Sequence, residues 1–243
     1  ELATVDASQK VQQTMDQTRQ KMFVQNEGID PDPFFEVMSP RYLLNRTPRD
    51  IVHHIGMARS MSEALRKDAG NAFSFEAREN PAEDCYEITV LTKDRPGLFA
   101  DMAGVLALNS VNILSADIYT WRDGTAVDIF KATKPLDPID PDRIWQKVRS
   151  DLKGTFEGKL SLAGLLGQKG TSSVLSNHEK PSRPPQIVMD NRASDFFTLI
   201  EVFADDRAGF LYLITKTLFD LRLDIRIAKI ATKGDQIADV FYV

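Results

Sequence analysis

The chain of 243 residues has few residues of the kinds that bind metals through sulfur or imidazole, with one cysteine, Cys85, and three histidines. A single cysteine excludes an internal disulfide and any zinc site built from several cysteines. It fits a reducing compartment, so we expect a cytoplasmic location. No apolar run approaches the roughly 20 residues that a membrane helix needs, and we expect no membrane partner.

Two phosphate-binding motifs are also missing. The sequence contains neither G-x-x-x-x-G-K-[ST] nor a G-x-G-x-x-G that follows a strand. Lys and Arg number 30 and Asp and Glu 35, which gives a net charge of −5. An acidic chain binds phosphate backbones poorly, so nucleic acid is not an expected partner. The hydrophobic fraction of 42% and charged fraction of 27% are ordinary for a globular protein of one or two domains.

The two ends of the sequence carry their own expectation. The chain begins at Glu1 without a signal-peptide pattern, and residues 237–243 read as a buried strand with no polar tail. We therefore expect both ends to be cuts through a longer protein. The function inferred from this sequence would then be one part of the function of that protein.

An internal repeat organises the chain. Two segments match at an offset of 112 residues (200 − 88 = 112), which becomes 111 after a one-residue gap in a turn. The matched pairs include Ile88 and Ile200, Asp94 and Asp206, Arg95 and Arg207, Gly97 and Gly209, Leu106 and Leu218, and Asp128 and Asp239. A repeat of this length, present twice, predicts two related domains and not a solenoid.

Each copy has the same predicted order of elements. In the first copy, residues 86–92 alternate as a strand, an amphipathic helix starts at residue 98, and strands at 112–120 and 125–132 form a hairpin. A second helix starts at Asp140, followed by an insertion and a fourth strand at 185–190. The order βαββαβ predicts an α+β, ferredoxin-like fold with an antiparallel sheet.

The predicted domains follow from this order. Residues 1–80 read as a helical connector that follows an absent catalytic region, and residues 84–192 as the first domain. The first domain carries an insertion at about 154–185, with a short helix near Leu162 and a mobile later half rich in Gly, Ser and Pro. Residues 196–243 read as a second domain truncated after its third strand. That sheet would lack a strand, and one of its helix-bearing sides would be bare.

The turn between the first strand and helix is the candidate binding site in each copy. Residues 94–97 (Asp-Arg-Pro-Gly) and 206–209 (Asp-Arg-Ala-Gly) each precede a helix, whose free amide groups and dipole favour an anion. We expect the next strand, at 112–113 or 224–225, to start at the same end of the sheet. Together these segments could hold a small amphoteric molecule. The alternative is a tight turn whose Asp only caps the helix.

The histidines and the cysteine are weaker candidates for metal binding or catalysis. His53 and His54 are adjacent on a predicted helix, so their side chains point about 100° apart and cannot bind one ion. Packing or capping is the simpler interpretation. Cys85 precedes a strand and has no histidine partner in the sequence pattern, which argues against a nucleophile. A remnant of hydrolase chemistry at the histidines is a further hypothesis that an assay can exclude.

The repeat unit resembles the ACT domain, a small regulatory module that binds amino acids. The resemblance lies in Thr-Lys-Asp-Arg-Pro-Gly-Leu-Phe at 92–99, Asn-Ile at 112–113, and Asp-Gly-Thr-Ala-Val-Asp-Ile-Phe at 123–130. The fuller pattern, with Val-Met-Asp-Asn-Arg at 188–192, is similar to the C-terminal tandem ACT region of bacterial bifunctional PII-protein uridylyltransferase/uridylyl-removing enzymes. Residues 34–54 resemble the connector that precedes that region.

The resemblance implies a function for the longer protein. Such enzymes sense glutamine, transfer UMP from UTP to the PII signalling protein when glutamine is low, and remove it when glutamine is high. The nucleotidyltransferase and phosphohydrolase domains that do this use Mg²⁺ or Mn²⁺, and their motifs are absent here. This chain would then contain no catalytic residue, metal or cofactor. Its partners would be glutamine or another small amino acid, the PII signalling protein and the upstream catalytic domains of the same polypeptide.

The resemblance also implies the ligand-binding residues. These are Asp94, Arg95, Pro96, Gly97, Leu98, Asn112 and Ile113 in the first copy, and Asp206, Arg207, Gly209, Phe210, Asp224 and Ile225 in the second. The second copy departs from the pattern at Ala208, Phe210 and Asp224. A structural or dimerising module that docks PII without sensing a ligand is the alternative function.

Overall fold

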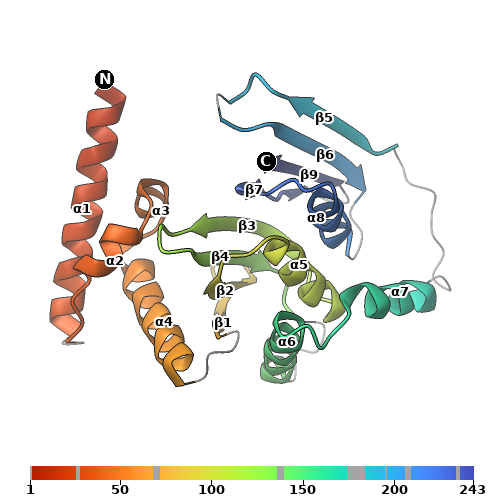
Figure 1. The fold of residues 1–243 in the computed structure, drawn as a ribbon, viewed down its shortest axis with the longest axis horizontal. Coiled ribbons are helices and arrows are strands. Elements are labelled where there is room, and N and C mark those ends of the chain that lie inside the picture. Colours follow the sequence, from red (N-terminus) through yellow and green to blue (C-terminus); the bar gives the residue numbers. More distant parts are fainter. Residues whose placement is uncertain are drawn as a thin grey trace. The chain divides into compact units, whose positions relative to one another are not determined.

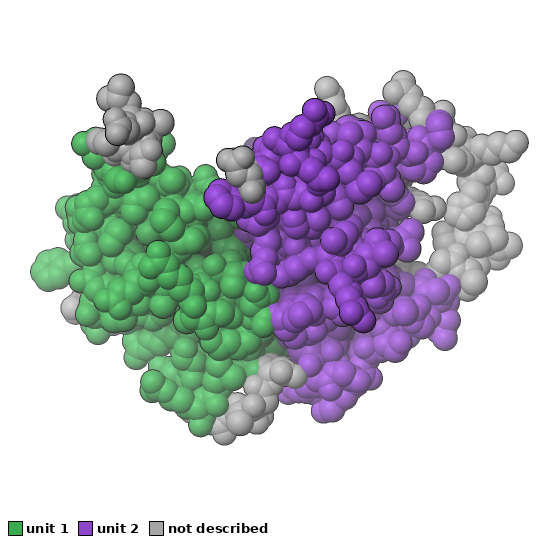
Figure 2. Space-filling view, turned by 45° about the horizontal axis from the view of Figure 1, so that its top comes forward, with its two compact units in different colours: residues 1–74, 90–94, 119–127 green, residues 75–89, 95–118, 128–243 purple. Residues whose placement is uncertain are grey.

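The structure is a computed structural model, and it describes residues 2–25, 28–67, 72–135, 140–173, 184–194, 196–205, 209–233 and 236–243. The described chain divides into two compact units (Figure 2). The first unit contains residues 1–74, 90–94 and 119–127, and the second contains residues 75–89, 95–118 and 128–243. The strands of the first repeat contribute to both units.

The first unit begins with four helices, labelled in Figure 1 as α1 (Leu2–Gln25), α2 (Asp32–Val37), α3 (Pro40–Asn45) and α4 (Pro48–Lys67). Thr47, a residue type that caps helices, followed by Pro48, which suits the first helical position, predicts a helix start, and α4 begins there. The Asp50 amide donates to the Thr47 hydroxyl at 3.3 Å, and the Thr47 amide donates to the Asp50 carboxylate at 3.1 Å. This reciprocal pair satisfies two amide groups at the start of the helix.

The first sheet has the strand order β1-β2-β4-β3. Its strands are β1 (Phe73–Asn80), β2 (Cys85–Lys93), β3 (Ile113–Thr120) and β4 (Thr125–Ala132). The predicted fourth strand at 185–190 is wrong for this sheet, because the edge position beside β2 is taken by β1. The predicted connector therefore ends in a strand, since Phe73, Phe75 and Ala77 alternate with polar residues in the manner of a half-buried edge.

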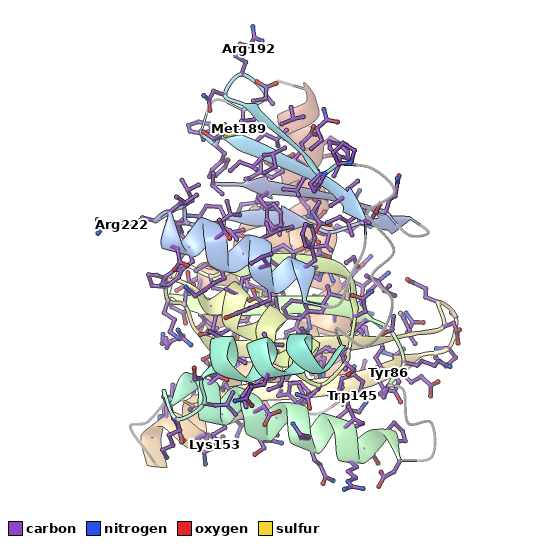
Figure 3. All side chains as sticks on the ribbon, turned by 90° about the vertical axis from the view of Figure 1, so that its right-hand side faces the viewer. Tyr86, Trp145, Lys153, Met189, Arg192 and Arg222 are labelled. Atoms are coloured by element: carbon purple, nitrogen blue, oxygen red, sulfur yellow. The ribbon has the colours of Figure 1, made fainter. Side chains whose placement is uncertain are left out.

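Three helices follow the strands of the first repeat. They are α5 (Leu98–Leu108), α6 (Pro141–Phe156) and α7 (Leu162–Ser173). As predicted, Asp140 caps α6, since its carboxylate accepts from the Arg143 amide at 3.1 Å. Trp145 of α6 packs on Tyr86 of β2 with ring centroids 4.8 Å apart (Figure 3). The predicted insertion thus includes a helix at its start, while its later part, 174–183, lies outside the described residues.

The second sheet has the order β5-β6-β9-β7, with β8 paired to β9. Its elements are β5 (Gln186–Asp190), β6 (Leu199–Asp205), α8 (Phe210–Asp220), β7 (Ile227–Lys229), β8 (Thr232–Lys233) and β9 (Gln236–Tyr242). The predicted missing strand is supplied by β5, which pairs antiparallel with β6. Both repeats therefore recruit their edge strand from the segment that precedes them.

One face of the second sheet is only partly covered by a helix. Met189 lies opposite Ile200, and Ile187 lies opposite Val202, so all four side chains share a face. Ile200 and Val202 are buried, but Ile187 and Met189 are 66% and 71% exposed. The described part of this repeat has one helix where the first repeat has two, as the sequence predicts.

The fold class is the one predicted from the sequence, an α+β arrangement of two ferredoxin-like repeats preceded by helices. No helix in the described ranges combines the length and apolar character that crossing a bilayer requires.

Candidate functional site

The turn before α5 has the open helix start that an anion site requires. Gly97 is the N-cap residue, with φ of 79° and ψ of 2°, and no side chain in the described part of the chain caps the helix. The Leu98 amide donates to the Arg95 carbonyl, and the Asp101 amide to the Gly97 carbonyl. The capping position therefore offers no side-chain acceptor to the amides of Phe99 and Ala100, and these groups point to where a carboxylate could bind.

Asp94 does not cap this helix, so that alternative interpretation of the turn is wrong in the first repeat. Its carboxylate accepts a hydrogen bond from the Thr120 hydroxyl at 3.1 Å, and its amide donates to the Gly124 carbonyl at 2.8 Å. These bonds attach the end of β2 to the β3–β4 hairpin. Asp94 positions the turn, and the helix start stays uncapped.

Arg95 is held against the helix that it precedes. Its guanidinium donates to the Asp101 carboxylate at 2.5 Å and lies over the ring of Phe156, 5.4 Å from the centroid. Burial raises the pKa of Asp101 above its ordinary value, and the hydrogen bond from Arg95 opposes that rise. The positive charge nearest the turn is thus already paired, while Pro96 stays exposed and Leu98 is buried.

At its glycine, the second turn has the same backbone angles as the first. Gly209 is the N-cap residue of α8 with φ of 79° and ψ of 4°, within a few degrees of Gly97, and among the described residues no side chain caps this helix. The Leu213 amide donates to the Gly209 carbonyl at 3.0 Å. Phe210 is half-buried. Asp206 and Arg207 lie outside the described residues. A positive φ favours glycine, which explains why both turns keep this residue.

The predicted place of the second strand in each site is wrong. In the second repeat, Asp205 at the end of β6 pairs with Gln236, whereas Ile227 at the start of β7 pairs with Tyr242. Asp224 and Ile225 therefore precede β7 at the end of the sheet opposite to the turn. A helix that connects two parallel strands returns the chain to the end where it started, which makes this separation unavoidable.

The first repeat shows the same separation. Asp94 hydrogen-bonds Gly124, just before β4, whereas the Asn112 carbonyl accepts from the Thr133 amide, just after β4. The Asn112 amide also donates to the Thr133 hydroxyl at 3.1 Å, and Ile113 is buried as the first residue of β3. Asn112 and Ile113 thus stand at the far end of their own sheet from Asp94.

The packing of α5 against α8 places the glycine turn of each repeat beside the helix end of the other repeat. A Cβ atom built at Gly97 would lie 3.1 Å from ring carbons of Phe219, near the end of α8. Reciprocally, a Cβ atom built at Gly209 would lie 3.9 Å from Cβ of Ala107, near the end of α5. The two helices are therefore antiparallel, and each turn faces the helix end from which the other repeat runs on toward Asn112 or Asp224.

Phe219 is a residue of this site to which the sequence analysis gave no role. The repeat offset pairs it with Ala107 (219 − 112 = 107), and both contacts join a glycine turn to the same helical position of the other copy. The apolar periodicity of an amphipathic helix predicts which residues are buried, but it does not identify what they contact. The only feature of the sequence that distinguishes this position is that one repeat has Phe and the other Ala there.

Asp224 is exposed and forms an ion pair with Arg226 at 2.8 Å. It follows Arg222, which points away from the end of α8 in Figure 3. An exposed carboxylate close to the end of α8 can bind an ammonium group at modest cost, because it is already solvated.

The histidines and the cysteine have structural surroundings. The Tyr42 hydroxyl lies 2.6 Å from Nδ1 of His54, and both residues are buried. Cys85 is buried, and that burial raises the pKa of its thiol. Within the described residues, no group of three or more His, Cys, Asp and Glu side chains could hold a metal ion. The packing interpretation of His54 is thus supported by its contacts.

Comparison with known proteins identifies the domain class of the first repeat. The ACT domain family matches residues 86–150, which span β2 to the greater part of α6, so this part of the chain is an ACT domain. An aspartate kinase from Synechocystis aligns with 64% of the chain and 24% of its own length at 16% identity, and its TM-score of 0.35 is too low to support an argument.

The relatives of the whole chain are more specific. It is 34% identical over 195 residues to the bifunctional uridylyltransferase/uridylyl-removing enzyme of Rhodospirillum rubrum, an alignment that covers 80% of the chain and 20% of that enzyme. The corresponding enzyme of Novosphingobium aromaticivorans is 35% identical over 184 residues, 75% of the chain and 20% of the enzyme. The chain is a homologue of these bifunctional enzymes and spans about a fifth of their length.

Proposed function

We propose that the chain is a regulatory region that binds a small amino acid, glutamine in the first instance, and passes this signal to uridylyltransferase and uridylyl-removing domains. The observation that carries the proposal is the uncapped helix start at Gly97, repeated at Gly209 with the same backbone angles. Two helix starts with the same glycine geometry, in a chain that contains an ACT domain, support recognition of a carboxylate.

The chemistry of an α-amino acid suits what each site offers. Its carboxylate would accept from the first free amides of α5 or α8, where the helix dipole is positive. Its ammonium group would bind an oxygen contributed by the other repeat, Asp224 for the first turn and Asn112 for the second. Ligand bound in this way contacts both repeats, so its binding free energy depends on how the two repeats are packed.

The proposal extends to the longer protein. By the names of its relatives, that protein would transfer and remove uridylyl groups, and we take PII as the substrate and Mg²⁺ or Mn²⁺ as the metal of catalytic domains outside this chain. A cytoplasmic location follows from this role. Bound glutamine would change the balance of the two activities only by having different affinities for the two arrangements of the enzyme.

Isothermal titration calorimetry of this chain with L-glutamine tests the proposal. We expect saturable binding that Asp224→Ala weakens by about tenfold or more, because a hydrogen bond to a charged group contributes about 1.5–3 kcal/mol. Asp142→Ala, an equally exposed acid in α6, is the matched control and should bind as the wild type does. If a folded chain binds neither glutamine nor any other amino acid, and binds PII when that protein is titrated, the docking alternative replaces the sensor.

A further inference from the structure

The β3–β4 hairpin is bonded to the start of the first turn. Asp94 accepts a hydrogen bond from the Thr120 hydroxyl at 3.1 Å, and its amide donates to the Gly124 carbonyl at 2.8 Å. Lys93, the last residue of β2, adds a third bond, since its Nζ atom donates to the Asp123 carbonyl at 2.9 Å. A displacement of Asp94 therefore either breaks these bonds or moves the loop of the hairpin.

The same hairpin binds the end of α2. The Arg122 amide donates to the Val37 carbonyl at 2.8 Å, and the Arg122 guanidinium donates to the Glu36 carbonyl at 3.4 Å. Both carbonyls belong to the last turn of α2, where no amide of the helix itself can reach them, and a positive charge is favourable there. Arg122 thus caps a helix that lies far from it in the sequence.

Aromatic packing joins the hairpin to α3. The rings of Tyr119 and Trp121 both meet the ring of Tyr42 edge-on, with centroids 5.2 and 5.6 Å away. All three side chains are buried. The Tyr42 hydroxyl in turn lies 2.6 Å from Nδ1 of His54 in α4. Edge-on contacts depend on the angle between the rings, so they are sensitive to a shift of the hairpin.

Asp94, residues 119–127 and the connector helices α2–α4 belong to one compact unit (green in Figure 2). Two backbone bonds close the hairpin loop inside it. The Trp121 amide donates to the Thr125 carbonyl at 2.8 Å, and the Gly124 amide donates to the Trp121 carbonyl at 3.0 Å. Because one small closed loop makes both sets of contacts, the loss of one set changes the free energy of losing the other.

We propose that the β3–β4 hairpin couples the first turn to the connector, so that a change at Asp94 alters the packing of α2 and α3. Thr120 and Gly124 bind Asp94. Arg122 and the two aromatic residues bind the connector. This inference rests on the proposed function for the ligand that uses the route, and it makes α2–α4 the place where the signal leaves the first repeat. A ligand of the turn uses the route by binding the two arrangements with different affinities.

The coupling is tested first without ligand. Thr120→Val keeps the β-branched shape of the side chain and removes the hydroxyl that binds Asp94. Thr133→Val is the matched control, because the Thr133 hydroxyl accepts from the Asn112 amide, also at 3.1 Å, beyond the other end of β4. A change that spreads only from Thr120 is a property of the hairpin, since both variants lose one hydroxyl from the same sheet.

Hydrogen–deuterium exchange is measured at three amides on the connector side. The Arg122 amide binds Val37, and the amides of Met38 and Arg46 end α2 and α3. We expect Thr120→Val to speed exchange at all three by about threefold or more, a part of the roughly tenfold effect of losing a hydrogen bond to a charged group. Thr133→Val should leave them unchanged. Unchanged exchange in Thr120→Val overturns the coupling, and so does an equal increase in the control.

The reverse direction gives a second, independent measurement, because coupling between two sites is reciprocal. Arg122→Ala removes the guanidinium from the end of α2 and should speed exchange of the Asp94 amide, which binds Gly124. Arg149→Ala, at an exposed arginine of α6, is the control and should leave the Asp94 amide unchanged. Equal rates in the two variants count against the coupling.

L-Glutamine then separates the route from the proposed function. When calorimetry shows that the wild type binds glutamine, binding should change exchange at Met38 and Arg46, and Arg122→Ala should reduce that change while glutamine stays bound. No change at the connector of the glutamine-bound wild type overturns the route, as does a change that Arg122→Ala leaves intact. If no protein binds glutamine but the ligand-free effects are found, the sensing function fails and the coupling stands.

Discussion

Gly104 of α5 lies directly against the ring of Tyr212 in α8, so that a Cβ atom at Gly104 would stand 2.8 Å from Cδ2 of that ring and 2.9 Å from Cδ1 of Leu162. Both distances are shorter than a carbon–carbon contact allows. Helices α5, α7 and α8 therefore pack closely at the position where any other residue would have its Cβ atom. Close approach, and not turn geometry, explains this glycine in the interior of a helix, where glycine otherwise destabilises.

This contact predicts that Gly104→Ala destabilises the protein. Overpacking typically costs about 1–3 kcal/mol, which exceeds the gain of about 1 kcal/mol from better helix propensity. Gly56→Ala in α4 is the matched control, because a Cβ atom there would meet nothing within 4 Å. It should stabilise by up to about 1 kcal/mol. Urea denaturation of both variants measures the two free energies, and a change of the same sign in both would contradict the packing argument.

Asp101 predicts a pH dependence of stability. Because its pKa is raised in the folded state, the folded protein binds a proton more tightly than the unfolded chain does. The contribution of this group to the free energy of unfolding is therefore full below the ordinary value of 3.8 and is lost as the pH rises through the folded-state pKa. Asp101→Asn should remove this dependence, and urea denaturation from about pH 3 to pH 7 measures it.

Arg95→Gln tests the same group from the other side. The hydrogen bond from Arg95 lowers the pKa of Asp101, so its removal should raise that pKa further. The loss of stability with rising pH should then extend to higher pH than in the wild type. Parallel curves for the wild type, Arg95→Gln and Asp101→Asn would show that Asp101 does not titrate in this way.

Tyr42 and His54 predict a structural and not a catalytic role for the histidine. Either Tyr42→Phe or His54→Ala leaves a buried polar atom without its partner, which costs about 1–3 kcal/mol. His53→Ala, at a half-buried position, should cost less. A phosphodiesterase assay with Mn²⁺ should be blank in all of these proteins. Activity that depends on either histidine would restore the hydrolase hypothesis.

Cys85 predicts slow reaction with thiol reagents in the folded protein. The side chain is 1% exposed, and burial raises the pKa of the thiol, with a further rise from the charge of Glu83. The reactive thiolate is therefore both scarce and inaccessible. Reaction with a disulfide dye at about pH 8 should proceed only at the rate of unfolding, and it should become complete at once in concentrated urea. Rapid native reaction would place Cys85 at the surface.

Local patterns in the sequence were sufficient to predict most elements. Strand alternation, the Thr47 and Asp140 caps, and the hairpin at Arg122–Gly124 depend on neighbouring residues, so α4, α6 and the β3–β4 hairpin start and end close to their predicted limits. The glycine turns were also predictable, because a positive φ at Gly97 and Gly209 is a local property. Two expectations failed. Strand β1 lies in the segment interpreted as a helical connector, and β5 completes the second sheet and not the first.

The sequence by itself determined the repeat, the strand–helix–strand–strand core of each copy and the two glycine turns. The repeat follows from comparing residues, and the core elements and turns follow from local patterns and backbone preferences. The tertiary structure decided which strand completes each sheet and which parts of the two repeats face one another. Both depend on the burial of apolar surface between segments far apart in the chain. The hydrophobic effect is not directional, so a sequence pattern shows that a surface is buried but not which segment covers it. The ring of Phe219 over Gly97 is the result of that packing.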